Sequence, residues 1–147
     1  MKKVVIITGI LILYLFSYFI FAGENTTYRV VVHSTNPTEV LSRKELSEMF
    51  LKKVETWDHG KAVHPVDLSD NSLIRNNFTE EIHRKDIDKI IAYWSKEFFK
   101  NQIASPPQMI NEIDVITYIE SDSGAIGYIS TTIPLEDYNV KVLNINQ

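Results

Sequence analysis

The sequence predicts one α/β domain in which helices cover both faces of a mixed sheet. Strand-type segments alternate with helix-type segments along the chain, and no segment repeats another or forms a low-complexity linker. The chain has 147 residues, of which 44% are hydrophobic and 23% charged, so its length and apolar content suit one core.

Residues 1–23 have the layout of an export segment. Lys2 and Lys3 precede an uncharged apolar run over residues 4–22. The run is long for a signal peptide and close to the roughly 20 residues that span a bilayer. The segment is therefore either a cleaved signal peptide or an N-terminal membrane anchor. Both interpretations place the domain, residues 24–147, in the periplasm or elsewhere outside the cytoplasm.

The domain is predicted to begin with a buried strand and a helix. Residues 28–33 contain a run of three valines, a β-branched density typical of a strand buried on both faces. Ser42 and Glu45 then form a capping box. Apolar residues recur at helical spacing after this box, so a helix is expected over residues 43–53.

A short strand and another helix are predicted next. Residues 63–68 have strand character, and Pro65 restricts them to a sheet edge or a strand start. Residues 70–72 are all of helix N-cap type, and the apolar spacing that follows predicts a helix to about Ile82.

The second half of the domain is predicted to contain two helices and two closing strands. One helix covers residues 86–99, and its aromatic residues are interpreted as core, so Trp57, Trp94 and Phe98 should be at least partly buried. A second helix is expected to start at Ser105, the cap before two prolines. Its buried stripe would consist of Met109, Ile110, Ile113, Ile116 and Ile119.

The end of this helix is predicted at Gly124, a glycine suited to positive φ. Gly127 is interpreted as a point of close backbone approach. Residues 125–129 and 140–145 are expected to be the closing strands, which completes the mixed sheet.

Composition excludes several function classes. The 19 acidic residues outnumber the 15 basic ones, so there is no basic field for nucleic acid. The absence of cysteine excludes disulfides and thiolate zinc sites. No nucleophile elbow occurs, and the histidines lack metal-ligand spacing, so we predict no catalytic residues, no metal, no cofactor and no enzyme activity. The histidines are His33, His59, His64 and His83.

Five motifs follow one another between residues 28 and 132. They are Leu41-Ser42-x2-Glu45-Leu46-x3-Phe50-Leu51, Trp57-x2-Gly60-Lys61, a Pro-Val strand, Ser72-x5-Phe78-Thr79 and Ser123-Gly124-Ala125-Ile126-Gly127-Tyr128-Ile129. Their order resembles the second lobe of the phosphate-binding, substrate-binding proteins of ABC transporters. The resemblance implies a type II periplasmic-binding-protein fold, here as a short single-lobe member of a family whose full members close two lobes over a ligand.

The predicted ligand turn departs from this family. In the phosphate binders, the loop before the helix offers an Arg, an Asp and a Ser-Gly-Thr turn. The Asp falls on Asp70 and the Ser on Ser72. The Arg, the Gly and the Thr fall on Leu68, Leu73 and Ile74. Because the bidentate cation and the close-approach glycine are missing, we predict weak phosphate binding or none.

The turn that leads into the helix is nevertheless the candidate ligand site. A strand end followed by a helix start is where open α/β sheets bind ligands, and unpaired N–H groups there attract an anion. The candidate ligand residues are Asp70, Asn71, Ser72 and Arg75. The alternative is that the turn only caps the helix and that Arg75 forms an exposed ion pair with Asp70 or Glu81.

Two functions stay open at this point. In the first, the chain is an exported solute-binding module that holds a small anion or another solute and passes it to a membrane transporter. In the second, it is an extracytoplasmic protein-interaction or sensing domain that has lost ligand binding and works with a receptor. A homodimer would unite the two, since a second copy would supply the other half of a two-lobed cleft.

Overall fold

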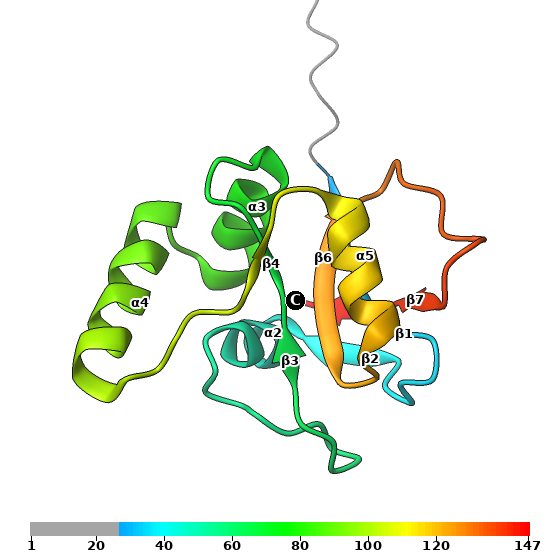
Figure 1. Ribbon diagram of the computed structural model, residues 1–147, viewed down its shortest axis with the longest axis horizontal. Coiled ribbons are helices and arrows are strands. Elements are labelled where there is room, and N and C mark those ends of the chain that lie inside the picture. The colour runs from blue at the N-terminus through cyan, green and yellow to red at the C-terminus, as the bar shows by residue number, and fades with distance from the viewer. Residues whose placement is uncertain (1–26) are drawn as a thin grey trace, which may run out of the picture.

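A computed structural model describes residues 27–147 and forms a mixed α/β domain (Figure 1). The strands are β1 (Tyr28–His33), β2 (Val40–Ser42), β3 (His64–Pro65), β4 (Asp67–Leu68), β5 (Gln108–Met109), β6 (Ala125–Ser130), β7 (Val140–Val142) and β8 (Asn144–Asn146). The helices are α2 (Arg43–Phe50), α3 (Leu73–Phe78), the π-helix η1 (Thr79–His83), α4 (Ile87–Asn101) and α5 (Glu112–Ser121).

The main sheet has the strand order β3-β6-β1-β7. Strand β1 is antiparallel to both of its neighbours, whereas β3 is parallel to β6, so the sheet is mixed as predicted. Val30, Val31 and Val32 are buried because β1 lies in the middle of the sheet. Two short parallel pairs, β2–β8 and β4–β5, complete the strand pairing.

Helices cover both faces of this sheet, which confirms the predicted class. Adjacent residues of a strand point to opposite faces. Gly127 of β6 faces α5, because a Cβ there would lie 2.7 Å from Val115 and 3.1 Å from Ile119. The next residue, Tyr128, faces the other side, where its ring stacks on Phe78 of α3 with centroids 3.9 Å apart.

Replacing Gly127 with Ala is expected to destabilise the domain by about 1 to 3 kcal/mol, because the added methyl group overpacks the interface between β6 and α5. The closest atoms would be methyl carbons of Val115 and Val66, at 2.7 and 2.9 Å. Urea denaturation measures the change. A second variant that combines Gly127→Ala with Val115→Ala should be less destabilised than the sum of the two single changes. Additivity of the two changes would contradict this packing argument.

The prediction of positive φ at Gly124 was wrong. Among the described glycines only Gly60 has positive φ, at 90°. Gly124 is instead a point of close approach, since a Cβ there would clash with the carbonyl oxygen of Ala62. Both glycines of the last motif, Gly124 and Gly127, therefore lie where a neighbouring group approaches too closely for a side chain.

The helix predicted from Ser105 was also wrong. Residues 105–107 are irregular, and β5 then pairs with β4, with Asp67 N donating to Pro107 O at 2.9 Å. The two prolines favour this extended course because each disfavours helical backbone in the residue before it. Helix α5 starts later, where Asn111 caps the N–H of Asp114 at 2.9 Å. Ile110, which precedes this helix, is consequently exposed, and Ile113 in its first turn is exposed as well, so neither belongs to the buried stripe.

Other elements also differ from their predicted extents. The closing strand expected over residues 140–145 divides into β7, in the main sheet, and β8, which pairs with β2. Helix α2 ends at Phe50, before the positive φ of Lys52. The strand expected over residues 63–68 divides into β3, which lies at the sheet edge as Pro65 requires, and β4, which pairs outside the main sheet. The helix expected to reach Ile82 continues past α3 as the π-helix η1.

Helix α4 stands apart from the sheet, on the left of Figure 1. It is anchored by Ile90 and Trp94, which form a small cluster with Leu51. Trp57 and Trp94 are buried as predicted, but Phe98 is 50% exposed. The aromatic residues of α4 therefore do not all belong to the core, because one side of this helix has no sheet to pack against.

The predicted export segment, residues 1–23, lies outside the described residues, and the domain boundary after it stays a prediction. Within residues 27–147, the longest apolar helical stretch falls short of what a membrane crossing requires.

Candidate functional site

The predicted ligand turn lies between β4 and α3. Strand β4 ends at Leu68, and Ser72 caps α3 by accepting a hydrogen bond from the backbone N–H of Arg75 at 3.3 Å. Ser72 N in turn donates to Ser69 O at 2.9 Å, which closes the turn. The capping role expected of this turn is therefore present, and it uses one acceptor position of the Ser72 hydroxyl.

Arg75 is buried, which corrects the expectation of an exposed ion pair. Its Nη1 atom donates to Leu68 O at 2.6 Å and pairs with Asp70 Oδ1 at 2.7 Å. Its Nη2 atom lies 3.6 Å from Asp67 Oδ2. The expected partner Asp70 is thus confirmed, while Glu81 interacts with Tyr28 instead. The guanidinium group links the end of β4 to the turn, because it contacts Leu68 at the strand end and Asp70 within the turn.

Asp67 and Tyr128 complete the network beneath the turn. The Tyr128 hydroxyl donates to Asp67 Oδ1 at 2.7 Å and accepts from Leu68 N at 3.3 Å. Burial raises the pKa of Asp67, while Arg75 and the Tyr128 hydroxyl act in the opposite direction. Burial, together with Asp67, also raises the pKa of Tyr128. Tyr128 was not predicted to belong to the site, although it stands in the motif that carried the resemblance.

The structure brings three of the four predicted site residues together. Asp70, Ser72 and Arg75 surround one turn, and Gln108 of β5 joins them by donating to Asp70 Oδ1 at 3.1 Å. Asn71 is exposed, and its side chain accepts a hydrogen bond from the Ser69 hydroxyl at 2.7 Å. Gln108 was missed because the pairing of β4 with β5 was not predicted.

A cavity of about 320 Å³ opens beside the turn. Asp70, Arg75 and Gln108 form its polar side, and one face of α4 forms its apolar side. The lining residues from α4 and the segment after it are Ile91, Trp94, Ser95, Phe98, Phe99, Ala104 and Ser105. The predicted ligand turn thus borders a hollow of the size that small-molecule sites have, about 300 to 1,000 Å³.

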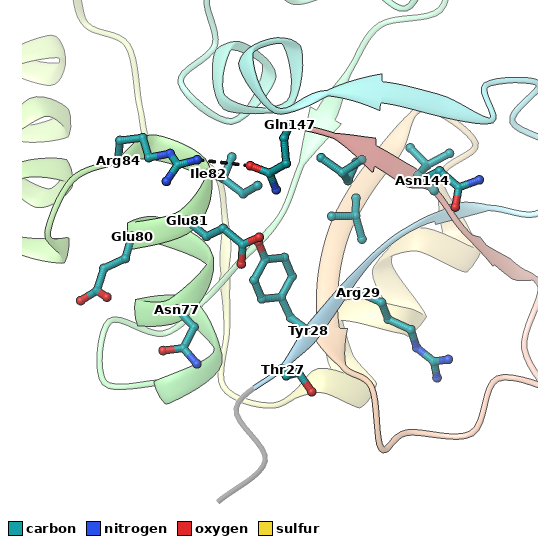
Figure 2. Close-up of a pocket in the computed structure, with 13 residues that line it drawn as sticks. Thr27, Tyr28, Arg29, Asn77, Glu80, Glu81, Ile82, Arg84, Asn144 and Gln147 are labelled. Atoms are coloured by element: carbon teal, nitrogen blue, oxygen red, sulfur yellow. Dashed lines mark hydrogen bonds between the residues drawn. The ribbon is translucent and has the colours of Figure 1, made fainter. Parts of the chain in front are cut away.

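A larger hollow of about 680 Å³ lies between β1, the region around η1 and β8 (Figure 2). Glu80, Glu81 and Arg84 give it mixed charge, and Arg84 donates to Gln147 Oε1 at 3.2 Å. Burial and Glu81 raise the pKa of Tyr28 on its wall. None of the predicted ligand residues lines this hollow, and its wall includes Thr27, which adjoins the undescribed residues.

The described residues hold no group of three or more histidine or acidic side chains suited to a metal ion. His64 pairs with Asp122 at 2.5 Å on the surface, and His83 contacts the Ser47 hydroxyl at 2.8 Å. The chemistry available at the ligand turn is therefore hydrogen bonding and charge pairing.

The fold is that of a periplasmic-binding-protein domain. The sequence model of the PBP superfamily domain matches residues 11–144, so the chain belongs to this family. No curated protein matches the chain.

Solved structures of phosphate-related receptors share the fold. An ABC-type phosphate transport receptor from Vibrio cholerae superposes with a TM-score of 0.58 at 16% identity over 80% of this chain. A possible phosphate binding protein from Planctomyces limnophilus gives a TM-score of 0.61 at 18% identity over 82% of this chain. The matches cover 45% and 41% of those two proteins, so the chain spans less than half of their length.

Proposed function

We propose that this chain is an exported solute-binding lobe that holds a small molecule in the cavity beside the β4–α3 turn and no longer recognises free phosphate. The observation that carries the proposal is the burial of Arg75. Its guanidinium group contacts Asp70, Asp67 and the Leu68 carbonyl and is therefore already occupied. The fold supports a binding role, and the predicted export segment supports an extracytoplasmic location.

The local charges argue against phosphate. An anion at the turn would have to displace Asp70 from Arg75, and it would meet the carboxylate of Asp70 at the cavity wall. Helix α3 is only six residues long and is already capped by Ser72, so its N-terminus contributes little to the binding free energy of an anion. A charge near an exposed helix end gains about 0.3 to 1 kcal/mol, whereas millimolar affinity needs about 4 kcal/mol.

Isothermal titration of the purified chain with inorganic phosphate should therefore give no saturable heat at submillimolar phosphate. The two flanking carboxylates and the capped turn are the physical reason. A micromolar dissociation constant would overturn the proposal. In that event Ser72→Ala and Arg75→Ala should weaken phosphate binding if the turn is the site. Indifference of the affinity to both changes would place the site elsewhere.

The second candidate is an interaction or sensing domain, and one observation favours it. Phe98 and Phe99 of α4 are 50% and 79% exposed, and exposed aromatic residues are common at protein interfaces. The partner would be a membrane transporter component, a receptor or a second copy of the chain. Size-exclusion chromatography with light scattering tests the last of these, because a homodimer through α4 should become monomeric in the Phe98→Ser/Phe99→Ser variant.

A further inference from the structure

The cavity beside α4 presents one accessible charged group, and that group is an acid. The side chain of Asp70 is 46% exposed, whereas the side chain of Arg75 is 2% exposed. Both line the cavity, and they are its only charged lining residues in the described part of the chain. A solute that enters therefore meets the carboxylate of Asp70 first, while the guanidinium group lies behind it.

The polar contacts of Asp70 converge on one of its two carboxylate oxygens. Asp70 Oδ1 receives both Arg75 Nη1 and Gln108 Nε2. These two contacts leave the other oxygen, Oδ2, unused, and the side chain as a whole is 46% exposed. The hydroxyl of Ser95 already donates to Ile91 O at 3.1 Å. The wall thus offers a partly exposed carboxylate to a ligand that donates hydrogen bonds.

The wall formed by α4 suits a ligand that combines an apolar part with a positively charged group. Trp94 and Phe98 lie one turn apart on α4, Phe99 follows directly, and all three line the cavity together with Ile91. Aromatic faces attract an ammonium or guanidinium group within about 6 Å of the ring centroid. The same faces bury the hydrocarbon part of such a ligand, as in other small-molecule sites. Phe98 and Phe99 are half-exposed or more, so a ligand can reach them.

From these observations, and resting on the proposed solute-binding function, we infer that the cavity selects a small organic cation. Its ammonium or guanidinium group donates to Asp70 Oδ2, and its apolar part lies along the aromatic face of α4. The predicted class of solute is thus opposite in charge to an inorganic anion. The selectivity comes from one exposed carboxylate set against an aromatic wall.

The test uses the ¹⁵N-labelled full chain and three probes of similar size: benzylammonium, benzyl alcohol and benzoate. The two tryptophan indole N–H signals are the readout. Trp94 lines the cavity, whereas Trp57 is buried elsewhere and donates to Gly124 O at 2.9 Å. Benzylammonium should shift the Trp94 signal saturably and bind about fivefold more tightly than benzyl alcohol. Benzoate should bind more weakly than the alcohol, and the Trp57 signal should stay in place.

Two variants assign the selectivity to its source. Asp70→Asn should bring the affinity ratio of benzylammonium to benzyl alcohol close to one. Asp137→Asn removes the same charge from an exposed turn outside the cavity, and it should leave the ratio unchanged. Phe98→Ala should weaken both probes alike, because it removes part of the apolar wall. An unshifted Trp57 signal in each variant verifies that the fold is intact.

The outcomes separate this inference from the function on which it rests. Equal affinities for benzylammonium and benzyl alcohol, or an unchanged ratio in Asp70→Asn, would overturn the cation inference and leave the solute cavity in place. Tighter binding of benzoate would overturn it as well. Failure of every probe to shift Trp94 at 20-fold excess over the protein would count against both, and it would favour the protein-interaction alternative.

Discussion

Replacing Arg75 with Met is expected to lower the free energy of unfolding by about 3 to 5 kcal/mol, the cost of leaving a buried charge without its partner. Arg75 is 1% exposed and contacts Asp67 Oδ2 at 3.6 Å, and Asp67 is itself buried. The change also removes the donor to Leu68 O, which lies at the end of β4. Urea denaturation followed by tryptophan fluorescence measures the loss.

Two controls separate the buried pair from general loss of charge. The double variant Asp67→Asn/Arg75→Met removes the stranded carboxylate, and Tyr128 can still donate to the new amide oxygen. It should therefore be more stable than Arg75→Met alone. Lys89→Met removes a charge that pairs with Asp86 at 3.4 Å on the exposed start of α4. Its effect should stay below about 1 kcal/mol. Equal losses for Arg75→Met and Lys89→Met would contradict the structural role of the network.

The stability of the domain should fall in acid, and His83 is the group responsible for much of the fall. Burial lowers the pKa of His83 to about 4, and the positive charges of Lys85, Arg75, Arg43 and Lys53 act in the same direction. The unfolded chain therefore binds a proton near pH 6.5 that the folded domain takes up only near pH 4. Stability is retained above pH 6.5 and is lost as the pH falls toward 4, by about 3 kcal/mol in total.

Denaturation curves of the chain and of His83→Gln at several pH values isolate this contribution. Glutamine has no proton to take up, and its side-chain amide can keep the contact with the Ser47 hydroxyl that His83 makes at 2.8 Å. The variant should thus lose less stability between pH 7 and pH 4 than the unaltered chain does. Parallel pH profiles for the two proteins would show that His83 titrates normally.

The fold was predictable because its main signals are local. The valine run of β1, the capping box of Ser42 and the proline at the sheet edge each act within a few residues, and all three were confirmed. The helix predicted from Ser105 was wrong because the local capping pattern is overridden by the pairing of β5 with β4. Asp67 and Pro107 belong to that pairing and are 40 positions apart, so no local rule reveals it.

The position of the turn between β4 and α3 was predictable, but the burial and pairing of its side chains were not. The strand end and the N-cap types located the turn, and Ser72 does cap α3. The burial of Arg75 depends on Asp67 beneath it and on Tyr128 from β6, 53 positions further along the chain. Contacts over such separations arise only when the sheet assembles. For the same reason the cavity beside α4 could not be anticipated, because its aromatic wall resembled an ordinary core stripe.

The central place of β1 has a consequence for how the chain reaches its folded state. Both neighbours of β1 in the sheet, β6 and β7, lie roughly a hundred positions later, with Tyr28 facing Ser130 and Val31 facing Val142. Ribosomes synthesise about 5 to 20 residues per second, so several seconds pass between the synthesis of β1 and that of β6 and β7. The sheet has a high contact order, and slow closure of the long loops should limit the folding rate. During synthesis the apolar residues of β1 therefore stay unpaired and prone to aggregation until the last quarter of the chain, which contains β6 and β7, has been made.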